Sequence, residues 1–163
     1  MKLIEVSPEL CVGCRLCEMV CSLAHFGECG TVKSNIRVYR DEEYGNNLIS
    51  MCMHCADAPC LEACAAIAIS RNESGVVVID EDSCTGCGDC VNACPLFAIS
   101  IDNSNMVAFK CDLCGGEPEC VQICSRQALS LVEIDPGSET RIDYRDNTSK
   151  LLKEALEATS SNG

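Results

Sequence analysis

The chain has 163 residues, of which 17 are cysteine, while it contains only three Phe, three Tyr and no Trp. Once those cysteines are set aside, the 47% of residues counted as hydrophobic falls to about 37%, which is too little for an ordinary globular core. The net charge of −13, from 12 basic and 25 acidic residues, argues against nucleic acid or an anionic membrane as a partner, because both select basic surfaces.

The start of the chain carries no recognisable targeting segment. Residues 1–9 (MKLIEVSPE) have neither an apolar core nor a cleavage motif, so we expect no signal peptide. The longest aliphatic run, Ala65–Ile69, has five residues, whereas a membrane-spanning helix needs about 20. The odd number of cysteines also excludes complete internal disulfide pairing. We therefore expect a cytoplasmic protein without direct membrane insertion.

Sixteen of the cysteines fall into four groups of four along the chain. The first and third groups have the spacing C-x2-C-x2-C-x3-C, and the second and fourth lengthen only the middle gap. In chain order the groups are Cys11, Cys14, Cys17 and Cys21; Cys52, Cys55, Cys60 and Cys64; Cys84, Cys87, Cys90 and Cys94; and Cys111, Cys114, Cys120 and Cys124.

This spacing is typical of iron–sulfur ligation. Three closely spaced cysteines can bind three irons of one 4Fe-4S cluster, and the fourth, on a short helical turn, faces the other way and binds a neighbouring cluster. Zinc sites instead use two separate C-x2-C pairs with a dozen or more residues between them. A zinc-stabilised interaction module is therefore the alternative from a different class of protein.

Short β-rich segments flank the groups. Those that precede a group are Lys2–Val6, Leu48–Ser50, Val76–Asp80 and Val107–Lys110, and those that follow groups two to four are Ile67–Ser70, Ala98–Ile101 and Ala128–Val132. The recurring unit is strand, cysteine loop, helical turn and strand, and each unit is too small to fold alone. Metal would replace the missing aromatic core, so we expect folding to depend on it. The spacing leaves nested and tandem pairing of the groups open.

Several residues outside the groups carry individual expectations. We expect His54 to donate a hydrogen bond to sulfur, His25 to lie in a loop, and Cys29 to be a buried or inert thiol. The lengthened loops Ala56–Pro59 and Gly115–Glu119 are acidic and contain proline, as expected of surface turns. The alternative is that these loops form docking edges beside the metal centres.

The tail, residues 133–163, differs in composition from the rest of the chain. Residues 148–158 (TSKLLKEALEA) predict an amphipathic helix capped by Thr148 or Asn147, which either packs on the body or docks a partner. The polar stretch Asp135–Asp146 before it is expected to be irregular. The apolar face of the helix would consist of Leu151, Leu152, Ala155 and Leu156.

The sequence contains no recognisable catalytic apparatus. It has no G-x-G-x-x-G after a strand, no P-loop and no plausible nucleophile–base set. We expect a chain without a catalytic site of its own.

Four stretches carry a resemblance to a known family. The chain resembles the four-cluster ferredoxin-like electron-transfer subunits that serve molybdenum- or tungsten-pterin oxidoreductases such as dimethyl sulfoxide reductase and formate dehydrogenase, and some carbon monoxide dehydrogenases and hydrogenases. Its compact length looks most like the small iron–sulfur subunit of a tungsten aldehyde oxidoreductase complex or a carbon monoxide dehydrogenase-linked ferredoxin. The stretches are CVGCRLCEMVC at 11–21, CMHCADAPCLEAC at 52–64, CTGCGDCVNACP at 84–95 and CDLCGGEPECVQIC at 111–124.

The resemblance implies a duplicated dicluster-ferredoxin-like α+β fold over residues 1–132, with an inner half at 48–101 and an outer half at 1–47 and 102–132. It also implies nested pairing and four 4Fe-4S clusters as cofactors. The implied ligand sets are Cys11, Cys14, Cys17 and Cys124; Cys52, Cys55, Cys60 and Cys94; Cys84, Cys87, Cys90 and Cys64; and Cys111, Cys114, Cys120 and Cys21.

The expected function is relay of single electrons between a large catalytic subunit and another redox carrier. The resemblance implies a molybdenum- or tungsten-pterin catalytic partner of the aldehyde oxidoreductase kind, with a further flavin- or iron–sulfur-containing subunit as a second candidate partner. The alternative within the class is a freely diffusing polyferredoxin that serves carbon monoxide dehydrogenase or hydrogenase. Because the chain is so acidic, we expect low reduction potentials.

Overall fold

The computed structural model describes residues 1–40, 47–134 and 145–154. In chain order its elements are β1 (Lys2–Val6), the 3-10 helix η1 (Pro8–Leu10), α1 (Leu16–Phe26), β2 (Ile36–Arg40), β3 (Asn47–Met51), α2 (Pro59–Glu62), β4 (Ile69–Arg71), β5 (Val77–Ile79), α3 (Asp89–Ala93), β6 (Ser100–Asp102), β7 (Val107–Phe109), the 3-10 helix η2 (Leu113–Gly116), α4 (Glu119–Ile123) and β8 (Leu129–Glu133). Residues 145–154 form a further helix.

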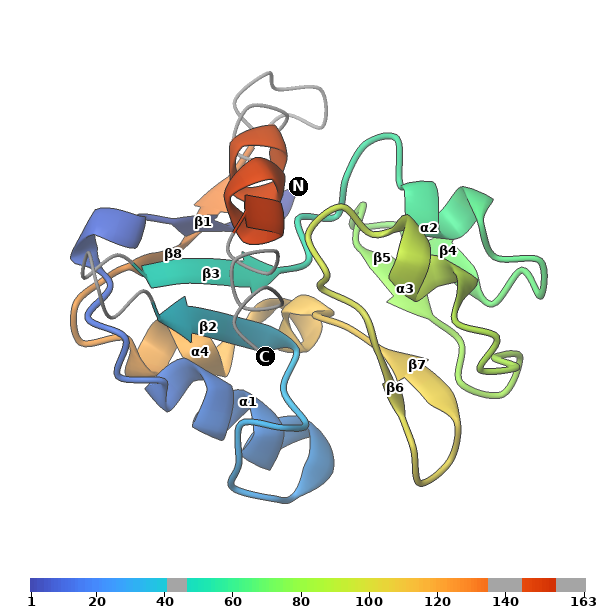
Figure 1. Ribbon diagram of the computed structural model, residues 1–163, viewed down its shortest axis with the longest axis horizontal. Helices are drawn as coiled ribbons and strands as arrows, with labels where there is room; N and C mark the ends of the chain where they lie inside the picture. Colours follow the sequence, from blue (N-terminus) through green and yellow to red (C-terminus); the bar gives the residue numbers. More distant parts are fainter. Residues whose placement is uncertain (41–46, 135–144, 155–163) are drawn as a thin grey trace.

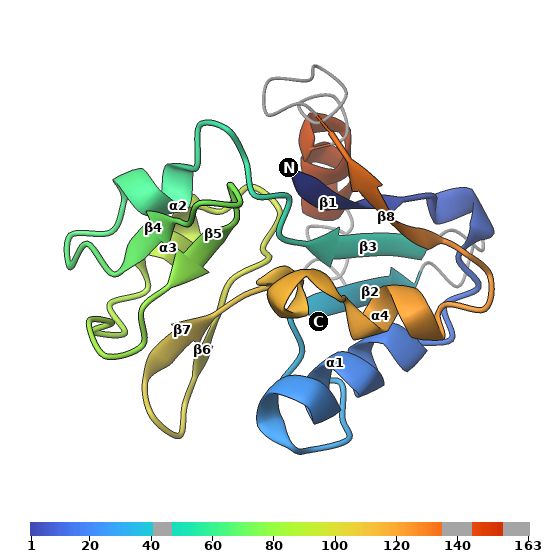
Figure 2. The same ribbon diagram turned by 180° about the vertical axis from the view of Figure 1, so that it is seen from behind.

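The elements form two lobes, which lie side by side in Figure 1. One lobe contains the antiparallel pairs β1–β8 and β2–β3 together with α1 and α4, which contact each other. Figure 2 shows α1 and α4 side by side below β2. The other lobe contains α2, which contacts α3, and the hairpins β4–β5 and β6–β7. The first lobe thus combines the two ends of residues 1–134, and the second is formed by the middle.

In the first lobe, β1 near the start of the chain pairs with β8 at 129–133. In the antiparallel β1–β8 pair Leu3 is opposite Val132, and the terminal amine of Met1 donates to the carbonyl of Ile134 over 2.8 Å. Leu3, Ile4 and Val6 of β1 are buried, and the polar Lys2 and Glu5 are exposed. The first cysteine group, which follows β1, is thereby brought next to the fourth, which precedes β8.

The predicted strands are present, with one systematic shift. Strands that precede a group lie where expected, whereas β4, β6 and β8 begin one or two residues later than the sequence pattern indicates. The cause is a repeated turn three residues after the last cysteine of each group. Ile67, Phe97 and Gln127 have positive φ of 55°, 52° and 55°. Each of these residues also donates its backbone N–H to the carbonyl of that cysteine, Cys64, Cys94 or Cys124.

The first group lacks this turn, and its expected short helical turn is wrong. Cys21 lies within α1, which runs for 11 residues and ends only at Gly27. No Gly or Pro interrupts residues 22–26, so the helix continues until Gly27 takes φ 67° and donates to the carbonyl of Leu23. This is a common way to end a helix. The strand β2, which no strand expectation covered, then follows and pairs with β3.

Three groups of buried apolar side chains form the core. The first joins β1, β2, β3 and β8 in one lobe, and the second joins β4, β5 and β7 in the other. In both, cysteines pack among the aliphatic side chains. The third lies between the lobes and contains Leu3, Met53, Leu96, Ala98 and Leu152.

In Figure 1 the helix at 145–154 lies beside β1 and above β3, and its Leu152 belongs to the buried group between the lobes. Leu152 is fully buried, which agrees with packing on the body, whereas Leu151 is 47% exposed, so the two do not share a buried face. The helix already includes residue 145, so Thr148 is a buried helical residue and not a cap, and residues 145–146 are not irregular. The remainder of the irregular stretch, 135–144, and residues 155–158 of the predicted helix lie outside the described residues.

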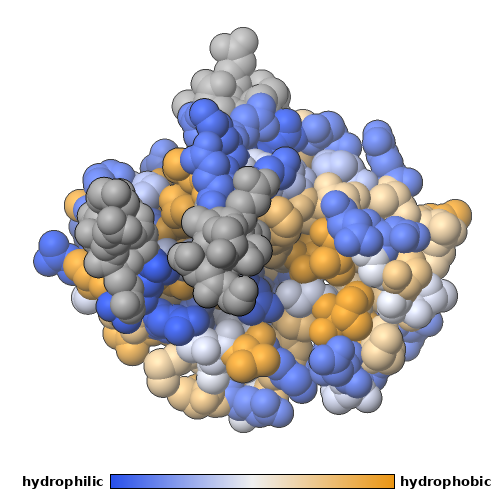
Figure 3. Space-filling view, viewed as in Figure 1, coloured by the Kyte–Doolittle hydropathy of each residue, from blue (hydrophilic) through white to orange (hydrophobic). Residues whose placement is uncertain are grey.

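Among the described residues no helix has the length and apolarity that a membrane crossing requires. Figure 3 shows hydrophobic residues scattered among hydrophilic ones on one face of the molecule.

Candidate metal centres

All seventeen cysteines lie in the described residues, and none of them forms a disulfide. Sixteen gather in four sets, and each set takes three members from one group and the fourth from another. Three of the sets line apolar hollows, partly open to solvent, of similar volume, about 330, 400 and 350 Å³ with the adjoining open space included, as repeated holders of one kind of group would.

The first lobe contains one such space. Cys11, Cys14 and Cys17 line it from the loop before α1, and Cys124 completes it from the end of α4. Val38, Ile49 and Leu129 supply the surrounding apolar wall. Gly13 has φ 65°, which lets the loop between the first two cysteines turn back sharply.

The second lobe contains two such spaces. Cys84, Cys87 and Cys90 share one with Cys64. The other is lined by Cys52, Cys55, Cys60 and Cys94. The third cysteine of each group lies in its helix, Cys60 in α2 and Cys90 in α3, and the fourth follows the end of that helix. Since α2 contacts α3, the fourth cysteine of each group lies beside the other group.

The last set lies in the first lobe beside α1 and α4. Cys21, Cys111 and Cys120 are buried together in its core, and Cys114 follows Cys111 in η2. The charge of a Cys21 thiolate would raise the pKa of both Cys114 and Cys120, although burial is the larger cause of each rise. The structure thus brings each predicted ligand next to the three others of its expected set.

The donors fit an iron–sulfur cluster chemically. Four sulfurs around a dry, apolar space of limited size are what a 4Fe-4S cluster requires. Burial raises the pKa of Cys60 to about 11 and that of Cys17 and Cys120 to about 12. Thiolates are the ligating form, so these buried thiols lose their protons only when a cation compensates the charge.

Backbone amides point at several of the sulfurs. Asn35 donates to Cys21, Ala98 to Cys94 and Ala108 to Cys84, each over 3.4 Å. Such N–H···S contacts stabilise negative charge on sulfur, and they are one of the means by which a protein adjusts a cluster's potential.

The two histidines differ in outcome. The His54 ring lies beside sulfur as expected, with Nδ1 3.7 Å from Cys52 Sγ and 3.2 Å from the amide nitrogen of Val77. The backbone N–H of His54 also donates to Cys52 Sγ over 3.4 Å. His25 is not in a loop, because α1 extends past it and places its Nε2 3.4 Å from Cys114 Sγ and 3.6 Å from Asp112 Oδ1.

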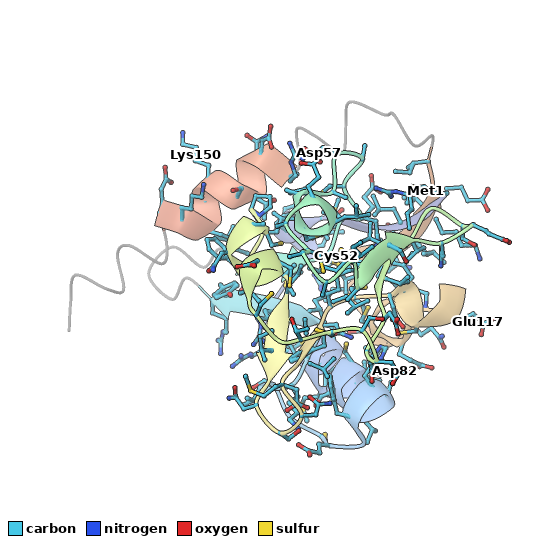
Figure 4. All side chains as sticks on the ribbon, turned by 90° about the vertical axis from the view of Figure 1, so that its right-hand side faces the viewer. Met1, Cys52, Asp57, Asp82, Glu117 and Lys150 are labelled. Carbon is cyan, nitrogen blue, oxygen red and sulfur yellow. The ribbon has the colours of Figure 1, made fainter. Side chains whose placement is uncertain are left out.

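The remaining expectations concern the surface. Cys29 is exposed and not buried. In the two acidic loops Asp57, Glu117 and Glu119 are exposed, as surface turns require, and Figure 4 shows Glu117 at the edge of the molecule. Their role as docking edges stays a prediction.

Sequence reasoning missed two basic residues near the cysteines. Arg145 forms a two-pronged ion pair with Asp57, with both N–O distances 2.7 Å, and its hydrogen bond and charge oppose the effect of burial on the pKa of Cys55. Lys110 is buried beside Cys111. In the sequence, the only indication that Lys110 lies near the metal ligands is its position next to Cys111, and no pattern placed Arg145 near Cys55.

Residues 46–134, more than half of the chain, match the family described as the 4Fe-4S dicluster domain. The chain belongs to this family. Membership in the 4Fe-4S dicluster domain family confirms iron–sulfur clusters as the cofactor and disfavours the zinc alternative. It also confirms the small mixed helix and strand architecture.

Several relatives of this 4Fe-4S dicluster domain protein have described roles. The polyferredoxin-like subunit of aliphatic sulfonate oxidoreductase from Pyrococcus furiosus is 43% identical over 86 residues, which cover 52% of this chain and 49% of that protein. PhsB, the electron-transfer subunit of thiosulfate reductase from Salmonella typhi, is 31% identical over 83 residues, 47% of this chain and 43% of that protein. The formate dehydrogenase iron–sulfur subunit of Wolinella succinogenes is 32% identical over 80 residues, 48% of this chain and 40% of that protein.

The matched segments thus span about half or less of the length of these relatives. The names describe iron–sulfur or electron-transfer subunits, in agreement with the expectation of a chain without its own catalytic site. Among solved structures, a chain of the active-site complex BamBC of benzoyl coenzyme A reductase aligns with 96% of this chain and 97% of its own length, with 24% identity and a TM-score of 0.49.

Proposed function

We propose that this chain is an electron-transfer subunit that relays single electrons through four 4Fe-4S clusters between a catalytic oxidoreductase subunit and another redox carrier. One observation carries the proposal: sixteen free thiols gather in four sets of four, three of which line apolar spaces of similar volume. When bound, each cluster supplies a site that gains or loses one electron.

The ligand assignment that we propose is nested. Groups two and three supply two clusters in the inner half, 48–101, and groups one and four supply two in the outer half, 1–47 and 102–132, so the ferredoxin-like unit occurs twice in residues 1–132. The β1–β8 pairing and the α1–α4 and α2–α3 contacts support this assignment over a tandem one. The tail, 133–163, is an extension whose helix packs across both halves.

The chain's own residues bind and insulate the electron path. Buried aliphatic side chains such as Ile49 and Val77 line the spaces and exclude water. Amide donors to sulfur stabilise the charge of the thiolates. At the two ends of the path Cys14 and Cys87 are exposed, each in a different lobe. Electrons can therefore enter at one lobe and leave at the other.

The partner that we propose is a large molybdenum- or tungsten-pterin catalytic subunit of the aldehyde oxidoreductase kind, with a flavin- or iron–sulfur-containing subunit on the other side. The names of relatives from formate dehydrogenase and thiosulfate reductase support a partner of the oxidoreductase class. We propose the cytoplasm as the location, because sixteen thiols without a disulfide suit a reducing compartment.

Anaerobic purification of the full chain from its native cells tests the proposal. We expect a brown protein with about sixteen iron and about sixteen sulfide per chain, which copurifies with a catalytic subunit. Purification of the loaded chain alone would favour a freely diffusing polyferredoxin. Zinc in place of iron, or a colourless chain that is fully folded, would overturn the proposal.

A pair of exposed cysteines provides a matched control. Cys87→Ser removes a proposed ligand, and we expect it to lower the iron content by about one to four atoms per chain. Cys29→Ser alters a thiol that is equally exposed but outside the four sets, and the iron content should stay at the wild-type value.

A further inference from the structure

Lys110 occupies the point where the chain returns from the second lobe to the first. It lies between the end of β7 at Phe109 and Cys111, the first cysteine of the fourth group. Figure 1 shows this crossing between β7 and the short helix before α4. The residue is only 6% exposed, although lysine is rarely buried unless it is paired.

The ammonium group of Lys110 joins two of the cysteine sets. It donates one hydrogen bond to the carbonyl of Cys111 over 2.9 Å and another, short one to the carbonyl of Val77. Val77 lines the space that Cys52, Cys55, Cys60 and Cys94 surround. Lys110 is therefore in contact with the wall of one set on one side and with a member of the other set on the opposite side.

A second link runs from the same backbone segment to a sulfur. The amide of Val77 donates to Nδ1 of His54, and the amide of His54 donates to Cys52 Sγ over 3.4 Å. Cys52 lies near the centre of the molecule in Figure 4, whereas the other labelled residues lie nearer its edge. Lys110 is thus linked to Cys52 through Val77 and His54.

Nothing in the described part of the chain neutralises this charge. No ion pair there involves Lys110, and its two hydrogen bonds are to neutral carbonyl groups. A buried charge without a counter-charge is strongly unfavourable. The groups of opposite sign that the fold brings near are the thiolates. Cys111 is its neighbour in the chain, and Cys52, Cys60 and Cys94 line the same space as Val77, whose carbonyl accepts from Lys110.

We propose that Lys110 is the buried counter-charge shared by the two clusters beside the lobe junction, those of the Cys52 set and the Cys111 set, and that it raises their reduction potentials above those of the clusters of the Cys84 and Cys11 sets. This inference rests on the proposed function and on the nested assignment. A cluster becomes more negative when it gains an electron, so a fixed positive charge nearby stabilises its reduced form. The Cys84 and Cys11 sets have no described contact with Lys110.

The consequence concerns electron flow between the lobes. With the Cys52 and Cys111 sites more easily reduced than the Cys84 and Cys11 sites, an electron that enters from either end is drawn to the junction and leaves it more slowly. Lys110 would then hold one or two electrons in the middle of the path until a partner that needs them is in place.

The test is a redox titration of the purified, cluster-loaded chain followed by electron paramagnetic resonance. Lys110→Met removes the charge with a side chain of similar length, and Lys110→Gln removes it but keeps hydrogen-bond donors. In both we expect two of the four centres to become at least tenfold harder to reduce, which corresponds to about 59 mV for a one-electron couple. The other two centres should not move.

Two control variants separate charge from shape and from general electrostatics. Lys110→Arg keeps the positive charge and should leave the potentials near the wild-type values. Lys153→Met removes an exposed charge from the helix at 145–154 and should shift no centre appreciably. Two other cations near the Cys52 set are unchanged in every variant: Arg145, and Arg71, which donates to the carbonyl of Cys55 over 2.6 Å.

The results that overturn the inference are specific. Unchanged potentials in both Lys110→Met and Lys110→Gln, or an equal shift of all four centres, would overturn it while leaving the proposed function intact. If the variants without the charge lose their clusters and Lys110→Arg keeps them, the counter-charge role is supported by iron content instead. Loss of clusters in Lys110→Arg as well would show that the site requires the shape of lysine and would overturn the inference. A wild-type chain without clusters would overturn the proposed function itself.

Discussion

Individual glycines make the tight cysteine loops feasible, and Gly86 is the clearest case. It is the second residue between Cys84 and Cys87, has φ 68°, and approaches the next hairpin so closely that an added Cβ would lie 2.1 Å from the carbonyl oxygen of Met106. Gly13 occupies the same place in the first group, where an added Cβ would lie 2.5 Å from Oδ1 of Asn47. At Gly86 both the backbone conformation and the space therefore require glycine, whereas at Gly13 the positive φ favours glycine and the near atom belongs to a side chain.

Gly86→Ala should damage the cluster of the Cys84 set. The left-handed conformation alone costs about 1–2 kcal/mol for an L-residue, and the contact with the Met106 backbone adds to it. We expect a lower free energy of unfolding and less than wild-type iron, measured in the anaerobically loaded chain. Gly30→Ala is the matched control, since no atom lies within 4 Å of its added Cβ; equal effects of the two substitutions would contradict this account.

The elements repeat one local design with one exception. Three groups end in a turn whose third residue after the cysteine has positive φ, and a strand follows it. In the first group the helix continues to Gly27, and the longer α1 gives α4 a surface on which to pack. The added element is the helix at 145–154, which contacts β1 through Leu3 and the second lobe through Leu96. Its ion pair from Arg145 to Asp57 lies beside the loop that contains Cys55.

Leu152 anchors that helix, and its neighbour Leu151 does not. Leu152→Ala should lower the free energy of local opening of residues 145–154 by about 2–5 kcal/mol, the usual cost of truncating a fully buried leucine. Leu151, which is 47% exposed, should change it by less than about 0.5 kcal/mol when replaced by alanine. Hydrogen–deuterium exchange of the helix amides measures both. Similar protection in the two variants would show that the helix is not held through Leu152.

The whole molecule is a strongly acidic body around clusters that add further negative charge. The chain carries −13 before any cluster is bound, and each oxidised cluster with four thiolates adds about −2. Every electron gained must be added against this field. Among the described basic side chains, Lys110, His54 and Arg145 act on sulfurs of the Cys52 set.

Low reduction potentials follow for the molecule as a whole. Iron–sulfur potentials range from about −700 to +450 mV, and we expect those of this chain to lie in the lower part, below roughly −200 mV. A spectroscopically monitored titration of the loaded chain measures them. The expectation fails if every centre is reduced well above that value. Raising the salt concentration should move the centres of the Cys11 and Cys84 sets, which include the exposed Cys14 and Cys87, more than those of the Cys52 and Cys111 sets, because screening acts mainly on exposed charge.

The sequence by itself predicted the iron–sulfur chemistry, the four cysteine groups and the local units. Cysteine spacing within a group is a property of a few adjacent residues, so Cys84, Cys87 and Cys90 could be assigned to one group, and the apolar residues of β1 could be recognised, without knowing anything distant. The end of α1 could also have been predicted from Gly27. The strands after groups two to four were predicted one or two residues too early. Their start depends on turns with positive φ at Ile67, Phe97 and Gln127, and these residue types do not indicate positive φ.

Only the tertiary structure decided what depends on contacts between distant residues. It brought Cys124 to the loop of Cys11 through β1–β8 pairing, it buried Lys110 between two sets of thiols, and it laid Arg145 on Asp57. It also showed that Leu152 is buried while Leu151 is not. The physical reason is that the burial and charge environment of a side chain are set by the elements packed against it, and those elements are far away in the chain.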